Sequence, residues 1–269
     1  MFLAQSLYES GRITYMRTDS TNLSEESLVS AQKWISKHLG EKYAKGPQKY
    51  RSRSKLAQEA HEAIRPTDVN SAPQEFGGSK KHLEKDNQKL YDLIWRRFVA
   101  SQLPPALLDA TKIEITAPSN LNPKPYTLVA SGSTIRFDGF LKIWPAKLEE
   151  KELPLAQESE ILKLLEVITG QHFTEPPPRY NEASLIKTLE KYGIGRPSTY
   201  APTISVIQER NYVEKNQGRF HPTEVGALVN RVLTENFPEV VDIDFTAKME
   251  SELDEIAEGE KVWTDTIRE

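Results

Sequence analysis

The sequence predicts a mainly helical α+β protein in three parts, at residues 1–103, 104–175 and 176–269. In the first and last parts apolar residues recur every three or four positions, which is the spacing of an amphipathic helix. The middle part instead holds runs of β-branched and aromatic residues, which favour strands. Two proline clusters, at 104–105 and 176–178, mark the boundaries because proline ends helices and interrupts strand pairing.

The composition is that of an ordinary globular protein. Of 269 residues, 38% are hydrophobic and 28% are charged, which excludes a disordered chain. The apolar stretches are short and broken by charges, so neither a membrane span nor a signal peptide is predicted. The absence of cysteine excludes disulfides, thiolate zinc sites and a cysteine nucleophile. A cytoplasmic location is expected.

The charge is unevenly distributed along the chain. The net charge is −4, but the last 50 residues hold 13 acidic and 4 basic residues, leaving 31 basic and 26 acidic in the remainder. Phosphate binding depends on the local field and not on the total charge. The sequence therefore permits a nucleic-acid partner without requiring one.

The first part is expected to contain three helices and a short strand. Residues 2–8 form a helix that stops at Gly11, and residues 12–15 form the strand. Asn22 and Glu25 resemble a capping box at the start of the second helix. Its apolar stripe is Leu28, Ala31, Ile35 and Leu39. A polar loop at 40–58 precedes a long helix predicted from Lys81 to Leu103.

The middle part should contain four strands, some of them without a partner in this chain. The predicted runs are Lys112–Thr116, Tyr126–Ser131, Thr134–Trp144 and Glu160–Val167. In the third part, Asn181 caps one helix and Thr199–Arg210 forms another, followed by a hairpin that turns at 216–218. Helix, turn, helix and hairpin form a winged-helix-like unit, which occurs both on DNA and as a structural module.

A tyrosine and an arginine two residues apart are the first candidate site. If Tyr15 ends a strand, Arg17 lies on the same face. Forming phenolate at pH 7 costs roughly 4 kcal/mol, and a guanidinium lowers that cost and grips phosphate. Asp19 would fix the arginine or cap the next helix. Taken alone, the spacing favours a half-buried tyrosine beside a surface ion pair.

Two further clusters carry possible phosphate donors. His61 and Arg65, four residues apart, would share one helical turn, or simply form the end of a surface helix. No histidine or cysteine stands at metal spacing from His61, so zinc is rejected. In the run from Gly193 to Tyr200, Arg196, Ser198 and Thr199 stand at a helix start, where amides bind phosphate or are merely capped. Arg210 would add a contact one helix further on.

Together the three clusters resemble, in order and in residues, the motifs of type IA DNA topoisomerases. Residues 7–20, LYESGRITYMRTDS, look like the catalytic tyrosine motif of the family. Residues 61–67 and 193–201 resemble two further signatures. Met16, the Ile-Arg-Pro of 64–66 and the Arg-Pro-Ser-Thr of 196–199 are most like the bacterial branch of the family. The likeness extends over essentially the whole chain.

The resemblance implies a reaction and roles for these residues. Tyr15 would attack a phosphate of one DNA strand, forming a 5′-phosphotyrosyl bond and freeing a 3′-hydroxyl. A second strand passes through the gap and the bond is reversed without ATP, which relaxes negatively supercoiled DNA. Arg17 would stabilise the charge on the phosphate, while His61 and Asp19 orient it or move protons. Arg65, Arg196, Ser198, Thr199 and Arg210 would bind the DNA, preferably single-stranded.

The sequence departs from the family pattern in one important way. The family carries an N-terminal Toprim domain whose acidic cluster binds Mg²⁺, and no such region is present in this sequence. Asp242-Ile243-Asp244 imitates the cluster, but position 246 is threonine, so the run is interpreted as structural. We expect a monomeric fragment, inactive alone, whose partner is the Toprim domain of the same enzyme.

Other functions remain to be compared with this one. A non-catalytic DNA-binding module would rest on the winged-helix-like unit and would not need Tyr15. Relaxases require paired histidines that the sequence lacks, and tyrosine recombinases place the nucleophile late in the domain. A protein-interaction scaffold that merely retains the motifs is the last alternative.

Overall fold

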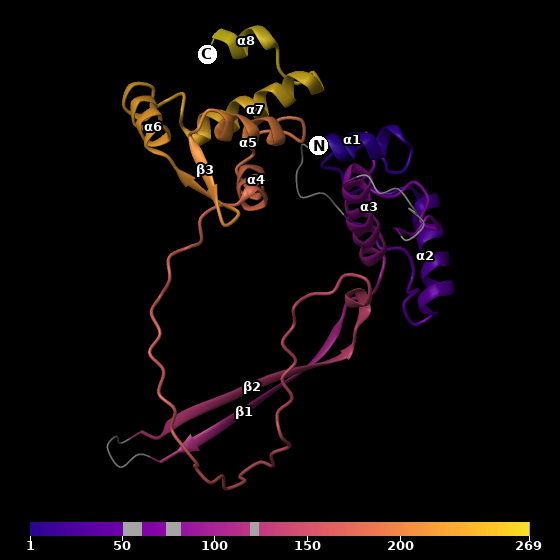
Figure 1. The fold of residues 1–269 in the computed structure, drawn as a ribbon, viewed down its shortest axis with the longest axis vertical. Helices are drawn as coiled ribbons and strands as arrows, with labels where there is room; N and C mark the ends of the chain where they lie inside the picture. Colours follow the sequence, from indigo (N-terminus) through magenta and orange to yellow (C-terminus); the bar gives the residue numbers. More distant parts are fainter. Residues whose placement is uncertain (51–60, 74–81, 119–123, 269) are drawn as a thin grey trace. The chain divides into compact units, whose positions relative to one another are not determined.

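The computed structural model describes residues 1–50, 61–73, 82–118 and 124–268. The chain forms two compact units, which meet in sequence between Gly170 and Gln171 (Figure 1). The first unit has a helical body and a long two-stranded hairpin, and the second is helical with a short hairpin. This confirms the predicted α+β class with mainly helical content. No helix in the described ranges is both long and apolar enough to cross a membrane.

The helical body of the first unit surrounds one hydrophobic core. Its helices are α1 (Phe2–Glu9), α2 (Glu25–Leu39) and α3 (His82–Ser101). Leu28, Ala31 and Ile35 of α2 are each 0% exposed, as their spacing predicts. Tyr91, Trp95 and Phe98 of α3 complete the buried face. The long helix of the sequence prediction is thus confirmed, although Lys81 lies outside the described residues.

The start of α2 differs from the prediction. Its N-cap is Ser24, whose hydroxyl accepts a hydrogen bond from the Ser27 amide at 3.3 Å, and not Asn22. The prediction placed the cap two residues early because Asn22 and Glu25 match the spacing of a capping box. The backbone oxygen of Asn22 instead accepts a hydrogen bond from Ala63, which ties it to the second sequence cluster.

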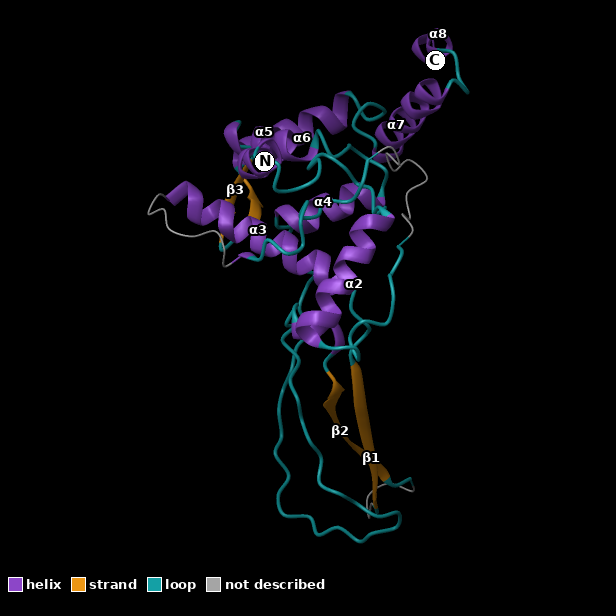
Figure 2. Ribbon diagram, turned by 90° about the vertical axis from the view of Figure 1, so that its right-hand side faces the viewer, coloured by secondary structure: helices purple, strands orange, loops and turns teal. Residues whose placement is uncertain are grey.

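The middle part forms one hairpin that is longer than predicted. Strands β1 (Leu107–Ala117) and β2 (Tyr126–Phe137) pair antiparallel (Figure 2). The runs 126–131 and 134–144 are therefore not two strands: β2 joins them and ends at Phe137. A 3-10 turn, η2 (Gly139–Lys142), follows because Gly139 adopts φ +49°. An added Cβ there would meet the carbonyl oxygens of Pro104 and Pro105.

The predicted strand Glu160–Val167 is wrong. Residues 161–181 form neither helix nor strand, and Figure 1 draws this stretch as an extended loop. A β-rich sequence becomes a strand only when a neighbour accepts its backbone hydrogen bonds. The described residues supply no such neighbour, and Ile161 and Leu165 remain 97% and 87% exposed.

The second unit confirms the predicted helix, turn, helix and hairpin order. Its elements are α4 (Glu182–Lys191), α5 (Tyr200–Glu209), β3 (Val213–Asn216), β4 (Arg219–Pro222), α6 (Glu224–Asn236), α7 (Ile243–Glu258) and α8 (Trp263–Arg268). Asn181 caps α4 in a capping box with Ser184. Phe220 of the hairpin and Ile204 of α5 are its buried residues, each 7% exposed.

Candidate active site and nucleic-acid interface

The tyrosine segment is joined to the second cluster by backbone pairing. The predicted strand at 12–15 is reduced to one antiparallel bridge, between Ile13 and Pro66. Beside it, the Thr14 amide donates to the Arg65 carbonyl at 3.0 Å, and the Thr14 hydroxyl donates to the Ala63 carbonyl at 2.7 Å. Ile13 is 1% exposed and anchors the segment in the core. Two motifs about 50 residues apart in sequence therefore form one structural unit.

Tyr15 lies between two other rings at this junction. Its ring centroid is 4.9 Å from that of His61 and 5.4 Å from that of Tyr8 on α1. The Tyr15 side chain is half-buried and packs at the edge of the hydrophobic core. His61 is exposed and stands at the end of the described segment. The site thus places a phenol ring beside an imidazole ring.

Arg17 and Asp19 follow Tyr15 on an irregular segment. Arg17 is exposed, and no ion pair of its guanidinium occurs within the part of the chain that the structure describes. Asp19 is half-buried and has an interaction partner. The Thr18 hydroxyl accepts a hydrogen bond from the Ser20 amide at 3.0 Å, which stiffens the loop behind them. An exposed guanidinium two residues from Tyr15 is available to an incoming anion.

Arg65 occupies a different environment from Arg17. Residues 61–65 are not helical, so the predicted shared turn with His61 does not form. The Arg65 side chain is 13% exposed and its Nη2 lies 2.6 Å from a Glu62 carboxylate oxygen. The other Glu62 oxygen accepts a hydrogen bond from the Ser24 amide at 2.6 Å. Glu62 therefore holds the 61–67 loop against the start of α2.

The Glu62 carboxylate is stabilised in its charged form. Burial alone would raise its pKa, but hydrogen bonds from Ser24 and Arg65 and the charge of Arg65 outweigh burial and lower the pKa. Arg65 Nε, in contrast, is buried and has no hydrogen-bond partner among the described residues. Removing the carboxylate would leave this guanidinium poorly compensated.

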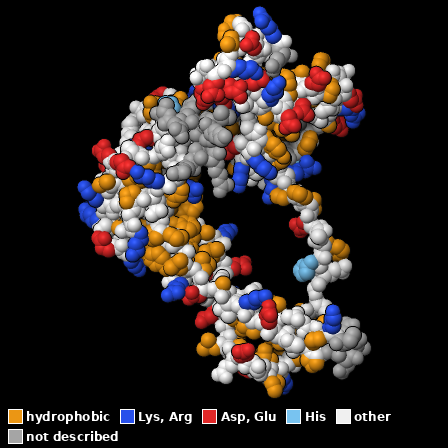
Figure 3. Space-filling view, turned by 180° about the vertical axis from the view of Figure 1, so that it is seen from behind, with side chains coloured by type: hydrophobic (Ala, Val, Ile, Leu, Met, Phe, Trp, Pro, Cys, Tyr) orange, Lys and Arg blue, Asp and Glu red, His pale blue; other side chains and the backbone are white. Residues whose placement is uncertain are grey.

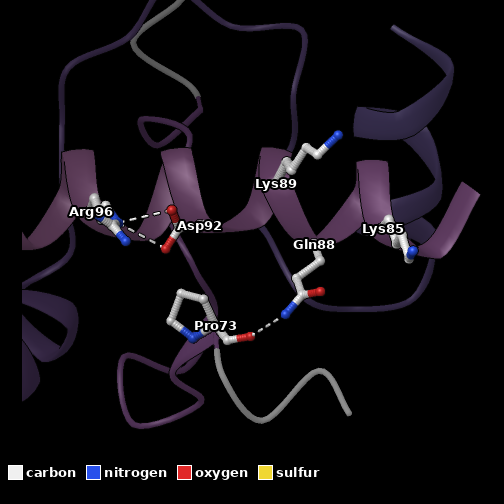
Figure 4. Close-up of a pocket in the computed structure, with 6 residues that line it drawn as sticks. All are labelled: Pro73, Lys85, Gln88, Lys89, Asp92 and Arg96. Atoms are coloured by element: carbon white, nitrogen blue, oxygen red, sulfur yellow. Dashed lines mark hydrogen bonds and ion pairs between the residues drawn. The ribbon is translucent and has the colours of Figure 1, made fainter. Parts of the chain in front are cut away.

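A groove of about 540 Å³ adjoins this site within the first unit. Its wall includes Ser20 and Thr21 from the tyrosine loop and Ala63 and Ile64 from the second motif. Hydrophobic side chains gather on this helical body near the start of the strands (Figure 3). A second hollow on α3, of about 460 Å³, is polar (Figure 4). Its Arg96 is paired with Asp92, so it offers no free arginine to a ligand.

The third sequence cluster, in the second unit, forms a tight loop before α5. Gly195 adopts φ +78°. The Arg196 amide donates to the Thr199 hydroxyl at 2.9 Å, so this hydroxyl closes the loop and does not cap α5. Ser198 and Thr199 are exposed, and Arg210, the C-cap residue of α5, is also exposed.

Arg196 is bound by two carboxylates of α7. Its Nη1 lies 3.4 Å from a Glu250 carboxylate oxygen, and its Nη2 forms a short ion pair with Asp254. Glu250 also accepts a hydrogen bond from the Gly195 amide at 3.1 Å. The sequence offers no local signal for this pairing, because the acidic residues stand 54 and 58 positions away.

Asp242 caps α7, which supports its interpretation as a structural residue. It accepts hydrogen bonds from the Asp244 and Phe245 amides at 2.7 and 3.3 Å. Within the described ranges, no group of three or more His, Cys, Asp or Glu residues could hold a metal ion. The sequence analysis did not single out Tyr8 and Glu62, which the structure places at the candidate site. Of the two, only Glu62 could have been predicted, because it stands three residues before Arg65, a spacing that favours ion pairs.

Comparison with known proteins identifies the family of this chain. A family model described as DNA topoisomerase matches residues 1–268. DNA topoisomerase 1 of Haemophilus influenzae is 49% identical over 98% of this chain, and that of Escherichia coli is 48% identical over 98%. The full-length topoisomerase I structure from Thermotoga maritima matches all of this chain with a TM-score of 0.78 and 36% identity.

The chain belongs to the DNA topoisomerase family. Its relatives are bacterial proteins named DNA topoisomerase 1, in agreement with the type IA resemblance of its motifs. The chain spans 30% of the length of these two relatives and 44% of the Thermotoga chain.

Proposed function

We propose that Tyr15 is the nucleophile of a type IA strand-cleavage reaction on DNA. The observation that carries this proposal is the junction at Ile13 and Pro66, which sets the Tyr15 ring 4.9 Å from His61. The phenolic oxygen bonds to phosphorus as the bond from phosphorus to the 3′-oxygen breaks, and the 3′-oxygen takes a proton. Reversal of these steps reseals the strand without ATP, and passage of a second strand in between relaxes negative supercoils.

The neighbouring side chains divide the supporting roles. Arg17, exposed two residues from Tyr15, stabilises the charge that develops on the phosphate. His61 accepts or returns the proton, or orients the phosphate. Asp19, like His61, orients the phosphate or moves a proton. Direct contact of Arg65 with DNA stays a prediction, since in this structure its guanidinium is engaged by Glu62.

The loop before α5 is proposed to bind the backbone of a single strand. Ser198, Thr199 and Arg210 are exposed and have the hydrogen-bonding groups that contact phosphates. Arg196 belongs to the same site but is held by Glu250 and Asp254. Preference for single strands and a monomeric state belong to this proposal.

The rest of the reaction is expected to need residues outside this sequence. The resemblance implies Mg²⁺ held by the acidic cluster of a Toprim domain of the same enzyme, in the bacterial cytoplasm. The described residues offer no comparable cluster. The three-part division at 103 and 175 likewise stays a prediction.

The test is formation of a covalent adduct with Tyr15. The chain is mixed with a separately expressed Toprim-containing portion of a relative, Mg²⁺ and a single-stranded oligonucleotide labelled at its 3′ end, then denatured and resolved on a gel. We expect a labelled band that Tyr15→Phe abolishes and that Tyr180→Phe, a change at an exposed tyrosine, leaves unchanged. Without the added portion the chain should not relax supercoiled DNA. An adduct that survives Tyr15→Phe would refute the assignment.

A non-catalytic DNA-binding module is the second candidate. It is favoured by the order of α4, α5 and the β3–β4 hairpin, which is that of a winged-helix-like unit. This alternative predicts tighter binding to duplex than to single strands, together with no adduct at any tyrosine. The same oligonucleotides, titrated as single strand and as duplex across a salt series, separate the two candidates.

A further inference from the structure

The carboxylate of Glu250 occupies an anion-binding position in the second unit. One of its oxygens accepts the Gly195 amide hydrogen at 3.1 Å, and the other lies 3.4 Å from Arg196 Nη1. A backbone amide and a guanidinium on one loop are the donors that proteins use for phosphate oxygens. A carboxylate held by both therefore takes the place that a phosphate would take.

A second carboxylate also pairs with Arg196. Asp254, one turn further along α7, pairs with Nη2, while Nη1 and Nη2 also donate to the Gly195 and Glu250 carbonyls at 2.7 and 3.2 Å. The side chains of Arg196, Glu250 and Asp254 are 20%, 24% and 28% exposed. The cluster is accessible to solvent at its edge, so an anion can reach it.

The attachment of α7 to this loop is mainly polar. None of the residues of α7, all of which the structure describes, is fully buried. The contacts from Glu250 and Asp254 to the loop are therefore a substantial part of what holds the helix there. Another anion can therefore replace these carboxylates at the loop without exposing a hydrophobic core.

We propose that Glu250 and Asp254 compete with a nucleic-acid phosphate for Arg196 and so set the affinity of this loop for a single strand. The inference rests on the proposed function, since it takes the loop at 193–199 to be a strand-binding site. Binding of a phosphate at Arg196 requires the α7 carboxylates to withdraw, because in the free protein two carboxylates surround the single positive charge of Arg196. Glu250 and Asp254 thus determine specificity, because only an anion that binds Arg196 strongly can displace them.

The test compares two substitutions that remove one negative charge each from α7. Glu250→Gln keeps an oxygen for the Gly195 amide but removes one of the two carboxylates from Arg196, whereas Glu258→Gln removes an exposed charge that has no ion-pair partner among the described residues. Binding of a labelled single-stranded oligonucleotide to the 269-residue chain is measured without cleavage. Freeing one charge-assisted contact should tighten binding about threefold to tenfold in Glu250→Gln, against less than about twofold in Glu258→Gln.

Asp254→Asn provides a second variant should Glu250→Gln fail to fold, as judged by circular dichroism. Each change is repeated in an Arg196→Ala background, where the gain in affinity for the oligonucleotide must disappear. A merely structural role of the carboxylates predicts the opposite sign, with a loosened loop and weaker binding.

Equal effects of Glu250→Gln and Glu258→Gln in folded protein, weaker binding by Glu250→Gln and Asp254→Asn, or no binding by any variant would each overturn the inference. The adduct at Tyr15 does not depend on these outcomes. Failure of competition and failure of the proposed cleavage reaction are therefore distinguishable.

Discussion

Replacing Glu62 by glutamine should destabilise the first unit. The Glu62 carboxylate joins the 61–67 loop to the start of α2, because one oxygen accepts the Ser24 amide hydrogen and the other pairs with Arg65. Glutamine has a single acceptor oxygen, so at least one of these contacts is lost. The Arg65 guanidinium then loses its counter-charge, and its Nε already has no hydrogen-bond partner in the part of the chain that the structure describes.

The exposure of the pair sets the magnitude of this effect. Breaking a fully buried ion pair costs about 3–5 kcal/mol, whereas an exposed pair contributes about 0–1 kcal/mol. Arg65 is 13% exposed and Glu62 is 32% exposed, so the pair lies between these cases. We expect a loss of about 1–3 kcal/mol. At an m-value of about 2 kcal/mol per molar urea, a loss of 2 kcal/mol lowers the midpoint by roughly 1 M.

Urea unfolding followed by tryptophan fluorescence measures this loss. Trp34, Trp95 and Trp144 lie in the first unit, and Trp263→Phe removes the tryptophan of the second. Glu149→Gln, at an exposed position outside helices and strands, is the matched control. A midpoint for Glu62→Gln equal to that of the control would refute the reasoning.

The pH dependence of unfolding gives an independent check of the same pair. The pKa of Glu62 is lowered in the folded protein, so its stabilising contribution is fully present above the ordinary glutamate pKa. That contribution is lost as the pH falls through the lowered pKa. Wild type and Glu62→Gln should therefore converge in stability on acidification. A difference between them that stayed constant into strong acid would contradict the assignment of the ion pair.

Three further changes test the core, the hairpin junction and the second unit. Leu28→Ala removes a side chain that is 0% exposed and should cost about 2–5 kcal/mol in urea unfolding of the first unit. Tyr43→Phe removes the 2.6 Å hydrogen bond to Asp138 and should cost about 1.5–3 kcal/mol. That hydrogen bond raises the Tyr43 pKa to about 12, so its contribution is complete below pH 10 and lost towards pH 12, which tyrosinate absorbance can follow. Gly226→Ala sets a Cβ against the Tyr212 carbonyl and should lower the melting temperature of the second unit alone, as measured by circular dichroism.

The elements that were predicted well are those stabilised by interactions between residues close together in the sequence. Helix α2 follows from the spacing of Leu28, Ala31 and Ile35, which burial confirms. Helix α4 follows from the Asn181 cap, and the β3–β4 hairpin from the turn at 216–218. In each case the interactions lie within a few positions, so a local pattern contains the necessary information.

The strands were less predictable because pairing is not local. The segments 12–15 and 160–167 both have strand-type residues, yet the first forms a single bridge and the second forms none. Propensity reports how a residue fits a pleated surface and says nothing of which neighbour is available. The strand β2, in contrast, continued past its predicted break because β1 supplied a partner over its whole length.

The same distinction separates the arginines of the candidate site. The sequence predicts Arg17, Arg65 and Arg196 as phosphate contacts, but of these three only Arg17 is exposed. Arg65 has an acidic residue three positions away, a spacing that favours pairing even when the backbone is not helical. The partners of Arg196 come from a helix more than 50 positions away, so only the folded chain shows that the arginine is already bound. A motif therefore identifies the chemistry that a loop can perform, whereas the competing ligands that control this chemistry are set by tertiary contacts.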